Sequence, residues 1–597
     1  MSEGEAVGTP PDRIRAIYEK PLPAFRSGVF YNTYPYPTKI MPESIAVYIA
    51  THTNVGDTVL DAFAGSGSTG LAALMCEHPT DSMKRIAREL GVEPRWGARN
   101  AVLYDISTYG CLASRVMTSP PDAGEFRKEA TALVERVKHE MGSLYRAQDL
   151  DGNEGQIRHV VWSSVYRCPH CGAEFTFYDG MVRWDPVRIG QAGSCPECGH
   201  ACSISDCEPM SSTTYDPLVG REVTQRRRVP VLVYGVTGKS KWRRPVNSND
   251  LALISEIESE QYPEYAPNAR IEWGELHRAG YHQGITHLHH FYTKRNFLAM
   301  SRVWHETEHY DTGMRDALRL LILSYNASHA TLMTRVVAKR NSRDLVLTSS
   351  QSGVLYISNL PVEKNVFNGL ERKIPSFCKA FGYVNGCSGK VTVHNASSTA
   401  VTETNESIDY VFTDPPFGGF IPYAEVNQIN ELWLGKTTDR GDEAIVSHSQ
   451  GKGVTEYGEL LSHSLAEANR VLKKDGVMTL VFHSSKADVW KALAKALHEA
   501  GLRVIATSNL DKEQDSFKQV VATAGVKNDS LMLLRKKAPE TDDAQDDGRI
   551  WTPESTDPRK AYAQYVNHCM ETGRTVKYDA DEYRDLILGR DERGDGE

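Results

Sequence analysis

Short apolar runs alternate with longer segments in which apolar residues recur at helical spacing. Strands are expected at residues 57–61, 101–105, 390–394, 410–413, 476–483, 502–507 and 530–534. Helices are expected between them at 71–76, 457–472 and 487–500. Alternating strands and helices are typical of an α/β protein whose sheet is doubly wound, with helices on both faces. The pattern therefore predicts one such sheet, built from two distant parts of the chain.

A long stretch without this alternation separates the two groups of strands. It begins with an amphipathic segment at 125–148, which predicts a helix, and ends with a mostly helical segment at 251–340. The 597 residues also exceed what one core usually holds. We predict four parts: a first half of the sheet domain at 13–122, an insertion at 123–385, a second half at 386–537, and an acidic linker with a small helical appendage at 538–597.

Charge and hydropathy narrow the class of protein. The apolar runs are too short to cross a bilayer, and the amino terminus has neither a basic region nor an apolar signal core. A cytoplasmic protein without a membrane partner is expected. The net charge of −9 argues against indiscriminate coating of nucleic acid, so a nucleic-acid enzyme of this composition needs a local basic surface.

The strand at 57–61 runs directly into a glycine-rich turn and a helix. Gly65 and Gly67 permit positive φ and close backbone approach, and the helix amino terminus offers unpaired N–H groups to a polar ligand. The turn has neither the three-glycine dinucleotide spacing nor a Walker lysine, so a nucleotide-like ligand without a pyrophosphate fits better. The next strand ends at Asp105, which could accept two ribose hydroxyls, although a carboxylate in that place is also a common helix cap.

The strand at 410–413 is followed by Asp414, Pro415, Pro416 and Phe417. Two prolines stop the ladder and leave the carbonyls of Asp414 and Pro415 for a ligand, while Phe417 can stack on a planar ring. Acceptors beside a stacking face suit the exocyclic amino group of a flipped base. An ordinary turn at a strand end is the alternative interpretation.

Two Cys-x-x-Cys pairs lie in the insertion, at Cys168 and Cys171 and at Cys195 and Cys198. Paired knuckles direct four thiolates at one tetrahedral ion, so a structural zinc ribbon is expected at about 160–210. Glycine follows each knuckle, as a tight turn requires. Cys202 and Cys207, which lie close behind, are interpreted as bystanders.

Two other features of the insertion have open interpretations. Residues 226–228 and 239–244 are rich in Arg and Lys around an apolar strand at 229–236, which predicts either a phosphate-tracking hairpin or a solvated basic edge. His287, His289 and His290 lie close together, but no carboxylate or cysteine accompanies them at helical spacing. They are predicted to be core or solvated histidines rather than metal ligands.

Together these motifs resemble the zinc-ribbon-containing, adenine-specific DNA methylases, which transfer a methyl group from S-adenosylmethionine. The resemblance covers residues 30–118 and 285–535 and implies a Rossmann-like methyltransferase sheet. It implies a cofactor site at Tyr34, Thr38, Lys39, Asp61, Ala62, Phe63, Gly65, Gly67, Thr69, Asp105 and Ile106. It implies that Asp414, Pro415, Pro416 and Phe417 are catalytic. The sequence departs from the family at residues 395–398, where an acid near the cofactor's adenine is common.

The predicted function is methylation of an exocyclic amino group, adenine N6, in double-stranded DNA by base flipping and direct in-line transfer. The insertion at 123–385 is the expected target-recognition region, and a restriction or defence partner is a further expectation. Three alternatives stay open: cytosine N4 methylation, methylation of an RNA base, and a nucleic-acid binder that has lost catalysis.

Overall fold

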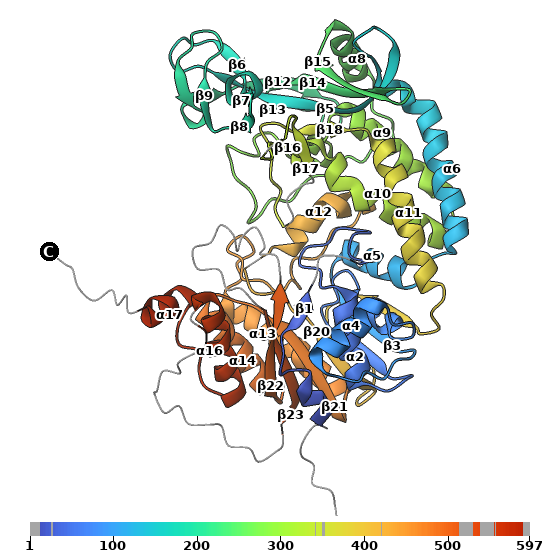
Figure 1. Cartoon of the computed structure of the whole chain (residues 1–597), viewed down its shortest axis with the longest axis vertical. Coiled ribbons are helices and arrows are strands. Elements are labelled where there is room, and N and C mark those ends of the chain that lie inside the picture. Colours follow the sequence, from blue (N-terminus) through green and yellow to red (C-terminus); the bar gives the residue numbers. More distant parts are fainter. Residues whose placement is uncertain are drawn as a thin grey trace, which may run out of the picture.

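The structure is a computed structural model, and it describes residues 12–24, 28–340, 342–348, 353–419, 421–512, 529–537, 555 and 557–588. Two lobes are stacked along the long axis of the molecule (Figure 1). The lower lobe holds strands from both ends of the chain, and the upper lobe holds the insertion. None of the described helices is both long enough and apolar enough to cross a bilayer.

A mixed eight-stranded sheet forms the centre of the lower lobe. In spatial order its strands are β1 (Leu22–Ala24), β22 (Leu502–Lys512), β23 (Asp529–Lys536), β21 (Leu472–Phe482), β20 (Ile408–Thr413), β2 (Thr58–Asp61), β3 (Asn100–Asp105) and β19 (Val391–Asn395). Only β23 is antiparallel to its neighbours among these strands. All seven predicted strands are present, whereas the short edge strand β1 was not predicted.

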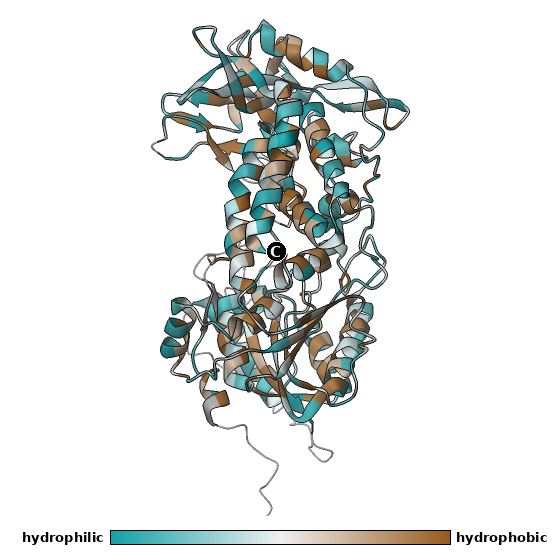
Figure 2. Cartoon of the chain, turned by 90° about the vertical axis from the view of Figure 1, so that its right-hand side faces the viewer, coloured by the Kyte–Doolittle hydropathy of each residue, from teal (hydrophilic) through white to brown (hydrophobic). Residues whose placement is uncertain are grey.

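Helices cover both faces of this sheet, as predicted. One face packs against α2 (Pro42–His52), α3 (Ser68–Met75), α4 (Asp81–Leu90) and α5 (Thr108–Thr118), and the other against α13 (Val454–Val471) and α14 (Ala487–Glu499). Side chains alternate along each strand, so in β20 Tyr410 and Phe412 join the first core and Val411 joins the second. Figure 2 shows apolar residues concentrated in this lobe's sheet and in the helix faces that cover it.

The upper lobe is built on a second sheet and a layer of helices. Its long strand β5 (Glu154–Arg167) pairs with β4 (Arg146–Gln148), β6 (Glu174–Thr176), β11 (Glu208–Pro209), β14 (Arg228–Thr237) and β18 (Val362–Lys364), and β14 pairs with β15 (Ser240–Pro245). Four long helices connect this sheet with the lower lobe (Figure 1): α6 (Ala123–Met141), α9 (Lys294–Glu306), α10 (Thr312–His329) and α11 (Val366–Val384). The insertion leaves the first sheet after β3, as predicted.

Two predicted helical segments are shorter than expected. The helix predicted at 125–148 ends at Met141, because a 3-10 turn follows and Arg146–Gln148 forms β4. In the segment 251–340, helix α8 (Ser248–Ser259) is followed by a long irregular stretch before α9. That stretch contains Pro263, Pro267, Gly274, Gly280 and Gly284, which interrupt helical hydrogen bonding.

The carboxyl-terminal appendage packs on the sheet domain. It consists of α16 (Pro558–Thr572) and α17 (Ala580–Ile587), which join the core formed by α13 and α14. The Thr507 hydroxyl of β22 donates to Glu571 at 2.6 Å, and Lys486 pairs with Asp579 at 2.8 Å. The helical prediction for this region is therefore confirmed, while the acidic linker at 540–547 lies outside the described residues.

Candidate active site

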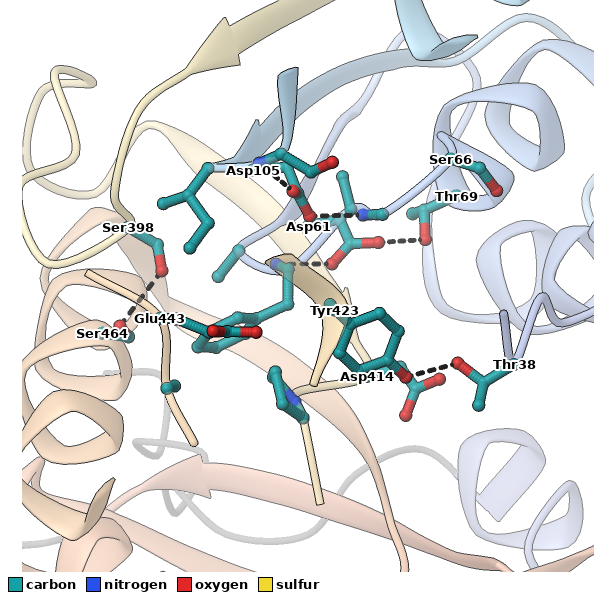
Figure 3. A pocket seen from close by; sticks show the side chains of 18 of the residues that line it. Thr38, Asp61, Ser66, Thr69, Asp105, Ser398, Asp414, Tyr423, Glu443 and Ser464 are labelled. Carbon is teal, nitrogen blue, oxygen red and sulfur yellow. Dashed lines mark hydrogen bonds between the residues drawn. The ribbon is translucent and has the colours of Figure 1, made fainter. Parts of the chain in front are cut away.

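A cavity opens at the carboxyl edge of the lower sheet, between β2 and β20. These strands are parallel neighbours, with Val59 opposite Tyr410, and from them the strand order proceeds in opposite directions. Such a switch point leaves a crevice between the loops that follow the two strands, and ligands bind there in open α/β sheets. The cavity measures about 1030 Å³ including its open mouth. Asp61 and Asp414, from sequence motifs that lie far apart, both line it (Figure 3).

The glycine turn after β2 brings backbone rather than side chains to the cavity wall. Gly65 and Gly67 have φ of 51° and 81°, and Gly67 caps α3. A Cβ on Gly67 would stand 2.8 Å from the Ser114 hydroxyl, and one on Gly110 would stand 2.5 Å from the Gly65 carbonyl oxygen. Both glycine residues of the turn are therefore required by conformation, and α5 can pack directly against it.

Asp61 ties the two halves of the cavity together. Its carboxylate accepts hydrogen bonds from the Thr69 hydroxyl (2.5 Å), the Phe63 N–H (3.1 Å) and the Thr413 hydroxyl (2.9 Å). Thr413 is the last residue of β20 and directly precedes Asp414. Burial raises the pKa of Asp61 to about 6, so its charge becomes sensitive to a cation in the cavity.

Asp105 holds the glycine turn from the next strand. Its two oxygens accept the N–H groups of Gly65 and Ser107, each at 2.7 Å. The hydrogen bond from Ser107 is the one that a carboxylate in an ordinary loop makes with the backbone two residues further on. The hydrogen bond from Gly65 joins the same carboxylate to the glycine turn at the cavity wall. Burial raises the pKa of Asp105 to about 7. Each oxygen keeps a second lone pair that a ligand hydroxyl can use.

One tyrosine fixes the loop that contains Asp414, and a second joins the start of the next helix to Thr38. The Tyr457 hydroxyl of α13 donates to the Pro416 carbonyl at 2.6 Å, which holds the double-proline turn. The Tyr423 hydroxyl, at the start of α12 (Tyr423–Leu434), forms a 2.6 Å hydrogen bond with the Thr38 hydroxyl. Figure 3 shows the Tyr423 ring beside Asp414 in the cavity. Segments near residues 38, 414 and 423 thus meet at one place.

Most of the predicted site residues line this cavity: Thr38, Lys39, Asp61, Ala62, Phe63, Gly65, Thr69, Asp105, Ile106, Asp414 and Pro416. Tyr34, Gly67, Pro415 and Phe417 do not line it, as far as the described residues define its wall. The buried Tyr34 supports the glycine turn from behind, because its hydroxyl donates to the Ser66 carbonyl at 2.6 Å. The Phe417 ring packs against Phe482 and His483, with centroids 5.5 Å and 5.8 Å away.

Several lining residues were not predicted. Tyr36, Thr438, Asp442, Glu443, Leu460 and Ser464 contribute to the wall. Glu443 accepts the Ala424 N–H at 2.9 Å and so fastens the loop after α12 over the cavity. Tyr36, which lies between the predicted Tyr34 and Thr38, stacks between Tyr109 and Tyr423 with centroids 6.2 Å and 6.4 Å away. Nothing in the local pattern of residues 436–453 marks them as a cover, because their position depends on contacts with distant segments.

The segment at 395–398, where the sequence lacks an acid, also reaches the cavity. Ser397 and Ser398 line the wall, and the Ser398 hydroxyl donates to the Ser464 hydroxyl at 3.0 Å. The Asn395 amide donates to the Asp105 and Ile106 carbonyls at 3.2 Å and 3.0 Å. Neutral hydroxyls therefore occupy this part of the site.

In the upper lobe, the sulfur atoms of Cys168, Cys171, Cys195 and Cys198 lie within 4.8 Å of one another. The Cys168–Cys198 and Cys171–Cys195 separations are 3.9 Å and 3.8 Å. Zinc–thiolate bonds of about 2.3 Å give a tetrahedral edge of about 3.8 Å, so the arrangement fits a zinc ion. Gly172 and Gly199, which follow the knuckles, have φ of 74° and 73°, as the tight turns require. Cys202 and Cys207 stand outside this set.

The histidine cluster has a carboxylate partner in space, which comes from a distant segment and not from helical spacing. Asp216 of β12 (Ser211–Asp216) accepts from the Nε2 atoms of His289 and His290 at 2.8 Å and 2.7 Å. However, His290 Nδ1 accepts the N–H groups of Thr286 and His287, which leaves its proton on Nε2. A metal ligand needs a free lone pair at that atom, so this cluster is a hydrogen-bonded clamp.

Three of the seven basic side chains in the predicted patch pair with acids. Arg227 pairs with Glu174, Arg243 pairs with Asp344 at 2.6 Å, and the buried Arg244 pairs with Asp250 at 2.9 Å. Acids outside the patch thus neutralise these three arginines, and phosphate contact by the other basic residues of the patch stays a prediction.

Comparison with known proteins agrees with the site. Residues 17–78, which include the glycine turn and Asp61, match the model of a family described as DNA methylase. The chain is 25% identical over 108 residues to the type II methyltransferase M.MjaII of Methanocaldococcus jannaschii, a match covering 18% of this chain and 16% of that protein.

Two solved structures superpose on part of the chain. The antibiotic-resistance methyltransferase Kmr is 13% identical with a TM-score of 0.15, covering 27% of this chain and 66% of Kmr. The [4+2]-cyclase SpnF is 9% identical with a TM-score of 0.15, covering 25% of this chain and 57% of SpnF. With TM-scores of 0.15, these two superpositions carry no argument about the fold.

Proposed function

We propose that this protein is an S-adenosylmethionine-dependent DNA methyltransferase that methylates the exocyclic amino group of a flipped base. One observation carries the proposal: the glycine turn after β2 and the Asp414 turn after β20 line one cavity, and Thr413 and Asp61 join them by a 2.9 Å hydrogen bond. A donor and an acceptor held there would be in contact, which direct transfer requires. The match of residues 17–78 to the DNA methylase family supports the same assignment.

The cavity wall fits the proposed cofactor. When bound, S-adenosylmethionine supplies an electrophilic methyl group on a positively charged sulfur. The carboxyl groups of Asp61, Asp105 and Glu443 line the cavity, and such a wall favours a cation. The Asp105 carboxylate can hold ribose hydroxyls with its remaining lone pairs, and the glycine turn admits the ligand without a side-chain clash.

Asp414 is proposed to act on the target amine. Its carboxylate would accept one amino hydrogen, and the backbone carbonyl of Pro415 would accept the second. These two hydrogen bonds would turn the nitrogen lone pair out of conjugation with the ring. When the nitrogen gains a carbon it must lose a proton, and we propose that Asp414 receives it. Tyr423, held by Thr38, offers a ring at the same end of the cavity. The stacking role proposed for Phe417 would require the base to reach its ring beyond the cavity wall.

Adenine N6 is the proposed target, because an Asp before the two prolines is the commoner form in adenine enzymes of the family that the sequence resembles. Modification-detecting sequencing of genomic DNA from a host that expresses the protein tests this. Methyladenine at a defined sequence is expected, and it should be missing from a host that expresses the Asp414→Ala variant. Methylcytosine would reassign the base, and a modification found only in RNA would contradict the DNA proposal.

We expect cofactor affinity to fall as the pH drops through about 7 and then 6. Burial raises the pKa of Asp105 to about 7 and that of Asp61 to about 6, so acid removes the negative charges that would attract the sulfonium. For each carboxyl that must lose a proton before binding, Kd rises by up to about tenfold for every unit by which the pH falls below the pKa of that carboxyl. Calorimetry between pH 5.5 and 8 measures this, and the neutral thioether product is the control ligand, for which a weaker pH dependence is expected. Equal pH dependence for both ligands would contradict the assignment.

The same shifts predict the pH dependence of stability. Because the folded pKa values lie above the unfolded value of about 3.9, the folded protein binds more protons than the unfolded chain in this range. Ionisation of these two carboxyls should therefore destabilise the ligand-free protein as the pH rises from about 4 to 7. Thermal unfolding with and without the cofactor isolates their contribution, because the cofactor pairs with the ionised carboxylates and its stabilising effect should grow over the same pH range.

A further inference from the structure

Three arginines of the upper lobe gather without an acidic partner in the described part of the chain. Arg226 ends β13 (Arg221–Arg226), Arg228 begins β14, and Arg335 begins β16 (Arg335–Val337). All three are half-buried, and among the described residues their Nε atoms have no hydrogen-bond partner. They differ in this from Arg227, Arg243 and Arg244, each of which has a carboxylate partner.

Tyrosine rings connect the three guanidinium groups. Arg335 lies over the Tyr356 ring, with 5.4 Å between its guanidinium carbon and the ring centroid, and Tyr356 packs against Tyr281 at 5.6 Å. Tyr281 follows Gly280, and a Cβ on Gly280 would stand 3.9 Å from Arg226 Nη2. The Arg228 Nη1 atom donates to the Arg226 carbonyl at 3.3 Å. The cluster therefore combines planar cations with half-buried aromatic rings, a combination suited to nucleic acid.

Concentrating these charges costs free energy in the absence of an anion. Burial, followed by repulsion from Arg226, lowers the pKa of Arg228 to about 10. The nearby turn after β16 adds the exposed Lys339, Arg340 and Arg343. A bound anion would offset this repulsion, and guanidinium forks match the oxygens of a phosphate.

The cluster lies beside the candidate active site. The segment that carries Tyr281 also donates the Gly274 and Leu276 N–H groups to Glu425 of α12. The segment that carries Tyr356 also contains Gly353, where a Cβ would lie 3.5 Å from Ile421, seven residues after Asp414. In Figure 1, β16 and its partner β17 (Val346–Thr348) lie between β13 and α12. Both segments thus connect the arginines with α12 and with the segment that follows Asp414.

We propose that Arg226, Arg228 and Arg335 bind the phosphodiester backbone of the DNA whose base enters the Asp414 cavity. The identity of the nucleic acid rests on the proposed function, whereas the anion site rests on the arginines themselves. Phosphate contacts fix the register of a duplex and carry no sequence information. The cluster would therefore hold any duplex with similar affinity and position its target base.

Binding of short DNA duplexes to the full chain, measured by fluorescence anisotropy at several salt concentrations, tests this site. Arg228→Gln and Arg335→Gln should each weaken binding equally for duplexes of unrelated sequence. Each should lower the slope of log affinity against log salt by about 0.9, the contribution of one phosphate contact. Arg227→Gln is the matched control, because Arg227 lies between Arg226 and Arg228 in the chain but pairs with Glu174, and wild-type affinity is expected.

Wild-type affinity and salt slope in an Arg335→Gln variant with unchanged thermal unfolding would overturn the site, as would an effect confined to RNA. Arg335→Lys, which keeps the charge, provides a second variant that should retain most of the slope. Cofactor calorimetry separates the two proposals. If the arginine variants weaken DNA binding but the wild type binds no cofactor, the anion site stands and the proposed function fails.

Discussion

Replacing Asp414 with alanine is expected to abolish methyl transfer while leaving the Kd for the cofactor nearly unchanged. Asp414 follows β20, whereas the glycine turn, Asp61 and Asp105 belong to β2 and β3. Removal of a group that accepts the amine's hydrogens costs about 10²–10⁴-fold in rate. We therefore expect at least a hundredfold loss of single-turnover rate, measured with radiolabelled cofactor, and an unchanged calorimetric Kd.

Asp488→Ala is the matched control for this variant. Asp488 is an exposed carboxylate in the first turn of α14, where it pairs with Lys491 at 3.0 Å, and it does not line the cavity. Its loss should leave both turnover and cofactor affinity at wild-type values. An Asp414→Ala protein with full turnover would remove this residue from the mechanism, and one that fails to bind the cofactor would place Asp414 in the cofactor site instead.

The central cavity could be predicted from the sequence because its parts depend on local rules. Asp61 and Asp414 each follow a short apolar run, and buried parallel strands present their carboxyl ends at one edge. The conformation of the glycine turn could be predicted from its residue types, since Gly65 and Gly67 both adopt the positive φ that glycine permits. These features needed no knowledge of the three-dimensional partner of either strand.

The upper lobe could not be predicted in the same way. β12 consists of mostly exposed polar residues, so no apolar alternation marks it as a strand. The pairing of Asp216 with His289 and His290 joins residues more than seventy positions apart, and the acids that neutralise Arg227 and Arg243 are also distant in sequence. Spacing rules describe neighbours along one element and do not reach across such separations.

The second large effect that we expect is the loss of bound zinc from a variant that lacks two of the four candidate cysteine ligands. The wild-type protein should contain one equivalent of zinc, and a Cys171→Ser/Cys198→Ser double variant should contain none. Cys171 and Cys198 are the exposed members of the four, so their replacement does not disturb the buried Cys168 and Cys195 directly. Zinc binding by such knuckles supplies about 10–16 kcal/mol of apparent folding free energy in isolated peptides, so residues 168–207 should become sensitive to protease.

Cofactor affinity should stay at the wild-type value in this double variant, because the cysteines lie in the upper lobe and the proposed cofactor site lies in the lower one (Figure 1). Cys202→Ser is the control: Cys202 is buried in the same segment but stands outside the four-sulfur set, so its variant should keep its zinc. Metal analysis and limited proteolysis check both results. Zinc retained by the double variant would contradict the assignment of these ligands, and zinc lost from Cys202→Ser would add a residue to them. Intact cofactor binding alongside a protease-sensitive ribbon would show that the zinc stabilises the insertion and that the sheet holds its ligand independently.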